Sequence, residues 1–211
     1  MKGSDPDRGA TASVAPVGCA RRGLLAAALL ALALAGCASS PYGQVHDRWT
    51  QREDAYSGWQ ASTLVRATLK SEAFRRAYVA EYARVFALNA EQQATLLDAE
   101  LEEQAESWVV VVALYTSEAA ANDLDPAHGH WSVRLEGPDG RWNLPAAVRE
   151  LPRKSPTWRH FFPAFEVHFR LHELRFSRRT PEGLPLAAPG EPLSLVIAGP
   201  PAQLRLRWTA P

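Results

Sequence analysis

The sequence has very few cysteines, and their positions exclude two kinds of chemistry. Only Cys19 and Cys37 are present, and both precede residue 38. A disulfide within residues 38–211 is therefore impossible, and so is a catalytic thiol there. With 46% hydrophobic residues over 211 positions, the remaining chain is long enough for one domain that is stabilised by an ordinary apolar core.

Net charge is also absent, because Lys and Arg together number 23 and Asp and Glu together number 23. Nothing at the level of the whole chain therefore indicates nucleic acid as a partner. The charges are unevenly spread: residues 37–130 are rich in acids, and residues 151–211 are rich in bases. Two complementary packed subregions would explain this polarity, and so would a basic end that meets anionic headgroups.

Common catalytic motifs are missing as well. There is no Gly-x-Ser-x-Gly, no phosphate-binding glycine loop and no dinucleotide fingerprint. His172-Glu173 begins like a zinc-protease motif, but Phe176 stands where the second histidine is required. We therefore predict no catalytic residues, no cofactor and no metal, although acids far apart in the sequence could still meet in a fold and form a hydrolase site.

The first 36 residues contain the clearest pattern. Arg21-Arg22 precedes an uncharged apolar run over residues 23–35 that is too short to span a bilayer comfortably. The run ends in Leu34-Ala35-Gly36-Cys37. These four residues closely resemble the lipobox of bacterial lipoproteins, the site recognised by the lipoprotein signal peptidase.

This resemblance implies that residues 1–36 are a signal peptide, that the chain is cut before Cys37, and that Cys37 carries diacylglycerol and an acyl chain. Several acyl chains give stable membrane anchoring. Ala38 follows the cysteine, where lipoproteins retained at the inner membrane of many Gram-negative bacteria have Asp. The implied location is thus the cell envelope, on the outer membrane.

Residues 37–44 are expected to form a tether, and residues 45–211 a single domain with a helical part over 45–107. Apolar residues from Leu64 to Phe86 recur at three- and four-residue spacing, without Gly or Pro over 59–107. Asn89 and Gln92 have the spacing of a capping box, which splits this stretch into two helices of about 25 and 16 residues. The acids between Asp98 and Glu106 are expected to form a solvated helix face.

The part over 108–211 is expected to be β-structure. Residues 108–115 form a β-branched run typical of a strand buried on both faces, and Gly137 to Gly140 indicate a hairpin turn. Alternation over 165–171 predicts a half-buried strand, and the change of phase after it predicts a bulge at His172–Glu173. Residues 193–197 and 204–208 predict a closing hairpin. The fold class is therefore α+β, a helical hairpin followed by an antiparallel β-sandwich.

Two clusters could bind something. His128 and His130 lie beside Asp123 and Asp125 in a loop that could bind a divalent ion weakly. His168 and His172 on one strand would be about 13 Å apart, which is too far to share one ion. The second cluster is Trp158, Arg159, His160, Phe161 and Phe162, a basic and aromatic connection that is a candidate contact for a partner or headgroup. Alternatively, Phe161 and Phe162 fill one end of the sandwich.

These patterns favour a lipid-anchored envelope lipoprotein that binds a protein partner or supports envelope assembly. The alternative is a periplasmic hydrolase whose site forms only in the folded chain.

Overall fold

A computed structural model describes residues 40–152, 155–163 and 168–211. The predicted signal peptide and the lipobox Leu34, Ala35, Gly36 and Cys37 lie outside the described residues. Ser40–Pro211 form one compact unit. Within the described part of the chain, no helix combines the length and apolar character needed to cross a membrane.

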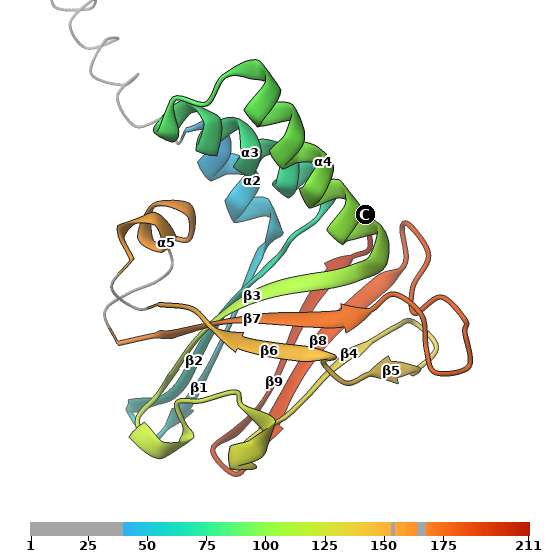
Figure 1. The fold of residues 1–211 in the computed structure, drawn as a ribbon. Coiled ribbons are helices and arrows are strands. Elements are labelled where there is room, and N and C mark those ends of the chain that lie inside the picture. Colours follow the sequence, from blue (N-terminus) through green and yellow to red (C-terminus); the bar gives the residue numbers. More distant parts are fainter. Residues whose placement is uncertain (1–39, 153–154, 164–167) are drawn as a thin grey trace, which may run out of the picture. The chain divides into compact units, whose positions relative to one another are not determined.

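A five-stranded antiparallel sheet, which we call sheet A, dominates Figure 1. Its order is β1-β2-β3-β7-β6, with β1 over Thr50–Ser57, β2 over Gln60–Leu69, β3 over Ser107–Thr116, β7 over Arg170–Ser177 and β6 over Ala147–Glu150. A four-stranded antiparallel sheet, sheet B, has the order β5-β4-β8-β9, with β5 over Trp142–Asn143, β4 over Ser132–Glu136, β8 over Pro192–Gly199 and β9 over Ala202–Thr209.

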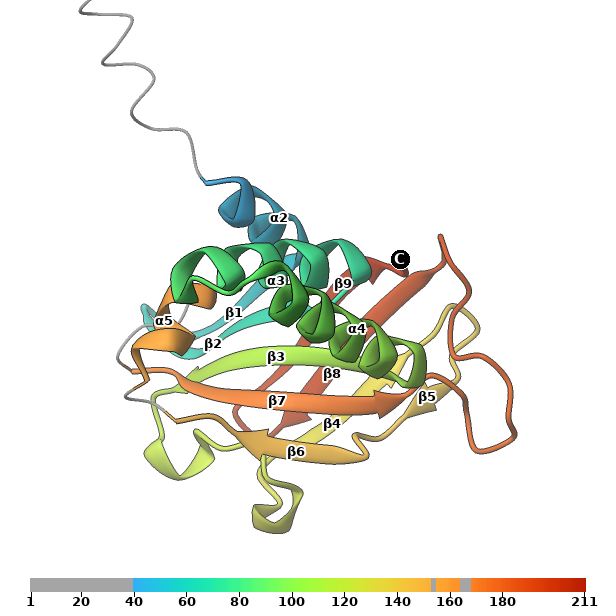
Figure 2. The same cartoon turned by 45° about the horizontal axis from the view of Figure 1, so that its top comes forward.

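In the described residues, four α-helices accompany the sheets: α2 over Pro41–Trp49, α3 over Glu72–Phe86, α4 over Ala90–Glu106 and α5 over Pro156–Phe161. Short 3-10 turns, η2 over Ala119–Ala121 and η3 over Pro126–His128, follow β3. Figures 1 and 2 show α3 and α4 over one face of sheet A, while sheet B faces the other. Sheet A is therefore covered on both sides.

The main apolar core lies between the two sheets. Its fully buried members come from both, for example Val110 and Leu174 from sheet A and Leu135 and Leu195 from sheet B. A second apolar cluster lies on the helix side of sheet A and includes Tyr42, Phe74, Val111 and Phe161. Because side chains alternate along a strand, β3 supplies both clusters and is buried almost throughout, as its β-branched sequence predicts.

The α+β class with antiparallel sheets is confirmed. The start of the second predicted helix is also confirmed, because the Asn89 side chain accepts from the Gln92 amide and the Gln92 side chain accepts from the Asn89 amide. The turn at Gly137–Gly140 and the closing hairpin of β8 and β9 are present as predicted.

The predicted helical part over residues 45–107 is wrong for residues 50–69, which form β1 and β2. Val65, Ala67 and Leu69 alternate into the core between the sheets, as in a strand. The spacing of Leu64, Val65 and Leu69 fits a helix equally well, which explains the wrong prediction. The first helix of the hairpin, α3, begins only at Glu72, where the Ser71 side chain accepts from the Phe74 amide as an N-cap.

The bulge predicted at His172–Glu173 is also wrong, because β7 pairs with β3 without a register shift from Arg170 to Ser177. Leu171 belongs to the helix-side cluster, whereas Leu174 and Phe176 belong to the core between the sheets. The strand therefore pairs without a bulge. Its apolar residues move from the helix side to the side of sheet B after Leu171, because Glu173 and Arg175 take the next helix-side positions. Of the strand predicted over 165–171, residues 165–167 lie outside the described residues and β7 begins at Arg170.

Candidate functional site

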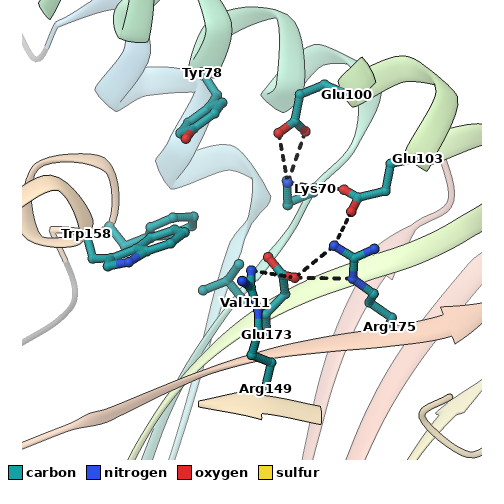
Figure 3. A pocket seen from close by; sticks show the side chains of 10 residues that line it. Lys70, Tyr78, Glu100, Glu103, Val111, Arg149, Trp158, Glu173 and Arg175 are labelled. Carbon is teal, nitrogen blue, oxygen red and sulfur yellow. Dashed lines mark hydrogen bonds and ion pairs between the residues drawn. The ribbon is translucent and has the colours of Figure 1, made fainter. Parts of the chain in front are cut away.

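A pocket of about 160 Å³ lies between helices α3, α4 and α5 and the helix-side face of sheet A (Figure 3). It combines charged and aromatic side chains from helices and strands that are distant in sequence. The residues that line it are Lys70, Tyr78, Glu100, Glu103, Val111, Arg149, Trp158, Phe162, Glu173 and Arg175.

The strand register explains why these side chains converge. Val111 on β3 is directly opposite Glu173 on β7, and Glu173 is directly opposite Arg149 on β6. Residues directly opposite each other in an antiparallel pair point to the same face. Arg175, two residues after Glu173, returns to that face as well.

The helix side of the pocket is held by a buried ion cluster. Arg75 on α3 is fully buried, and its guanidinium binds Glu100 and, with Nη1 2.7 Å from Oε2, Glu103 on α4. The Lys70 ammonium lies 3.0 Å from Glu100 and 3.3 Å from Glu103. Although burial alone would raise the pKa of Glu103, Lys70 and Arg75 hold that pKa below its usual value.

The sheet side of the pocket repeats this pattern around Glu173, which is only 4% exposed. Its Oε1 accepts hydrogen bonds from Arg149 at 3.1 Å and from Arg175 at 3.2 Å. The Arg175 guanidinium also reaches Glu103 at 2.5 Å and links the two sides. Counted with Arg75 behind the lining, four cations face three carboxylates, so the pocket has a positive excess.

Aromatic rings form the remaining wall. The rings of Trp158 on α5 and Phe162 lie 5.7 Å apart, and the Lys70 ammonium lies 5.9 Å from the centre of the Tyr78 ring. Burial raises the pKa of Tyr78, and nearby Glu100 adds to this effect, so Tyr78 stays neutral at physiological pH. A planar or apolar group could stack here while an acidic group meets the guanidinium groups.

The predicted contact residues in and just after α5 differ in burial. Trp158 is half-buried and lines the pocket, whereas Arg159 and His160 are exposed, with His160 2.8 Å from Glu81. Phe161 and Phe162 are buried in the helix-side cluster. These two rings therefore fill the interior between the helices and sheet A, not the end of the sandwich that was the alternative, and Phe162 also lines the pocket.

The acids of α4 were expected to form a solvated face, and this is wrong for Glu100 and Glu103. Both are half-buried and ion-paired. The sequence signal for this site is weak. The two acids are three residues apart on one helix face, but their partners lie elsewhere, Lys70 just after β2 and Arg75 on α3. Arg149, Glu173 and Arg175 carry no motif that would have linked them to the site.

The histidine loop has a different arrangement from the one expected. Asp123 lies 2.9 Å from His128 Nδ1 and 3.5 Å from Nε2 of His172, and its Oδ1 accepts from the Asp125 amide. Burial lowers the pKa of His172, which is 1% exposed. Across the described ranges, no three His, Cys, Asp or Glu side chains are grouped so that they could hold a metal ion.

Comparisons of the whole chain with known protein families, with curated proteins and with solved structures found no match.

Proposed function

We propose that this chain is a lipid-anchored lipoprotein of the bacterial cell envelope, exported to the outer membrane, whose domain acts by binding a partner. Support for the anchor comes from the lipobox Leu34-Ala35-Gly36-Cys37 and the positive apolar leader before it. Because the compact unit begins at Ser40, a cut before Cys37 would leave the whole folded unit attached to the lipid.

The observation that carries the binding role is the pocket between α4 and sheet A. Its carboxylates are paired with Lys70, Arg75, Arg149 or Arg175, and for Glu103 these cations hold the pKa below its usual value, which disfavours proton donation. The side chains of Arg149 and Arg175 remain 60% and 44% exposed. We infer that they receive an acidic group of an envelope protein, with Trp158 beside it.

Two measurements test this proposal separately. Intact-mass analysis of the protein from its native membrane, beside a Cys37→Ala control, tests the anchor. We expect the mass of residues 37–211 plus diacylglycerol and an acyl chain, and its loss in the control. An uncut, unlipidated mass would refute the lipoprotein assignment.

Binding is tested with a photo-crosslinking amino acid at position 158, and at position 142 as the control, because Trp142 is exposed and lies in sheet B. We expect a defined partner adduct from position 158 alone, and its loss when Arg149→Glu is added. Adducts that are identical from both positions, or unaffected by Arg149→Glu, would show that the pocket is not the contact.

A further inference from the structure

The turn between α3 and α4 exposes apolar side chains at one end of the domain. Residues 85–88 read Val-Phe-Ala-Leu and contain no charge. Val85 is 40% exposed and Phe86 is 45% exposed, and the two are adjacent in the sequence. We call Val85, Phe86 and Leu88 the apical turn.

The apical turn is held in a defined conformation. Ala87 has a left-handed backbone with φ of 51°, and the Leu88 amide donates to the Ala83 carbonyl at 3.0 Å. The Phe86 ring packs at 4.4 Å from the Tyr82 ring. The capping box at Asn89 then starts α4 immediately. The structure thus fixes Phe86 at the surface.

A chain of ring contacts places the apical turn near the start of the folded domain. The Tyr42 ring lies 5.9 Å from Phe161, and its hydroxyl donates to the Phe161 carbonyl. Phe161 in turn stacks on Tyr82 at 5.6 Å, and Tyr82 contacts Phe86. Figures 1 and 2 show the end of α3 beside α5 and on the same side of the domain as the start of α2.

The closeness of the apical turn to the start of α2 matters because a lipid on Cys37 would be attached only three residues before Ser40. A fully extended segment of that length spans at most about 11 Å. The start of α2, and with it the apical turn, would therefore be kept close to the bilayer surface.

The charges around the apical turn suit a phospholipid surface. Arg84 is 68% exposed, Arg159 on α5 is exposed, and the His160 ring lies 4.9 Å from the buried Phe161 ring. Glu81, at 12% exposure, pairs with both Arg84 and His160, and the exposed acid Glu91 lies in the first turn of α4. Apolar residues with basic neighbours at a bilayer are the arrangement that binds anionic headgroups and the acyl boundary.

We propose that the apical turn inserts Phe86 and Val85 into the headgroup region of the bilayer that holds the lipid anchor, with Arg84 and Arg159 on anionic headgroups. The inference rests on the proposed lipid anchor and adds an orientation to it. The domain then has a membrane-facing end, and the turn between β1 and β2, at the far end of β1 from α2 in Figure 1, points away from the bilayer.

The test uses the absence of a free thiol in residues 38–211. The lipidated Phe86→Cys protein is labelled with an environment-sensitive fluorophore and reconstituted into vesicles of phosphatidylethanolamine and phosphatidylglycerol that contain brominated lipid. Trp59→Cys is the matched control, because Trp59 is fully exposed in the turn between β1 and β2. We expect bromine quenching several-fold stronger at position 86 than at position 59.

Adding Arg159→Glu should reduce the quenching at position 86 when phosphatidylglycerol is present. Equal quenching at both positions in a protein of lipidated mass would overturn the orientation and leave the anchor intact. An unlipidated mass would overturn both proposals.

Discussion

The two faces of sheet A differ in what they bury. Toward sheet B, the strands present a mainly apolar surface, with Val112 and Leu174 among its members. Toward the helices, the same strands present an apolar half with Ala113 and Leu171 and a charged half around Glu173. The face toward sheet B therefore contributes to stability through apolar burial, whereas the face toward the helices also forms one wall of the polar pocket. The comparison indicates that the pocket depends on its covering helices.

The largest expected effect is on the charged half. Arg75→Ala removes a fully buried cation and leaves Glu100 and Glu103 with Lys70 and Arg175 only. We expect the free energy of unfolding to fall by about 3–5 kcal/mol, since Arg75 is the fully buried member of the cluster and its loss leaves the two carboxylates with less opposing charge. Chemical denaturation measures it. Arg76→Ala is the control, because Arg76 forms an exposed pair with Glu72 and should change stability by less than about 0.5 kcal/mol.

The apolar face is tested by Leu174→Ala. Leu174 is fully buried between the sheets, so we expect a loss of about 2–5 kcal/mol from lost burial and the cavity left behind. Leu184→Ala makes the same change at a side chain that is 51% exposed and should have little effect. Similar losses for both variants would contradict the position of the core.

A smaller effect is expected where the helices cover the sheet. Asn89→Ala removes the side chain that caps α4, and we expect a loss of about 1 kcal/mol. Thr95→Ala on the exposed side of α4 serves as the comparison, because its hydroxyl bonds only the Glu91 carbonyl within the same helix. If the cap variant also weakens crosslinking from position 158, the pocket depends on the start of α4.

The smallest effect concerns pH. His46 is buried among Tyr42, Phe74 and Phe162, and burial lowers its pKa despite the neighbouring Asp47. The unfolded chain therefore takes up a proton at a higher pH than the folded chain does. Its contribution to stability is present above about pH 6.5 and is lost as the pH falls below that value.

We expect unfolding curves between pH 7 and pH 5 to show falling stability, and a shallower fall in His46→Asn. His172, whose pKa is lowered in the same direction, remains in that variant, so part of the fall should persist. An unchanged slope in His46→Asn would argue against a neutral buried imidazole.

The local patterns were the predictable part of this fold. The β-branched run of β3, the Asn89 cap and the turn before Arg141 each carry their signal within a few residues, and all three are present. β2 was missed because its alternation over ten residues runs directly into α3, and residues 64–69 satisfy both periods. Propensity could not decide between them, because the decision comes from pairing with β3.

The pocket could not be predicted for a related reason. Lys70 lies between β2 and α3, while Glu100, Arg149 and Glu173 come from α4, β6 and β7. Each looks like an ordinary surface residue in its own segment. Only the register of β3, β7 and β6 and the packing of α4 bring them together. Trp158 was identified from composition, but the neighbouring Phe161 and Phe162 were buried by contacts with Tyr42 and Phe74 that the sequence does not specify.

The direct passage from α2 into β1 has a mechanical consequence. β1 is an edge strand that pairs only with β2 in sheet A, so a pull transmitted to its first residue would peel it away one hydrogen bond at a time. The helix before it is fastened separately, by the Tyr42 hydroxyl on the Phe161 carbonyl and by the Trp208 indole on the Trp49 carbonyl. A force applied through a tether on the N-terminal side would therefore act on α2 first. The hydrogen bonds that hold this helix would have to break before the force reached the edge strand.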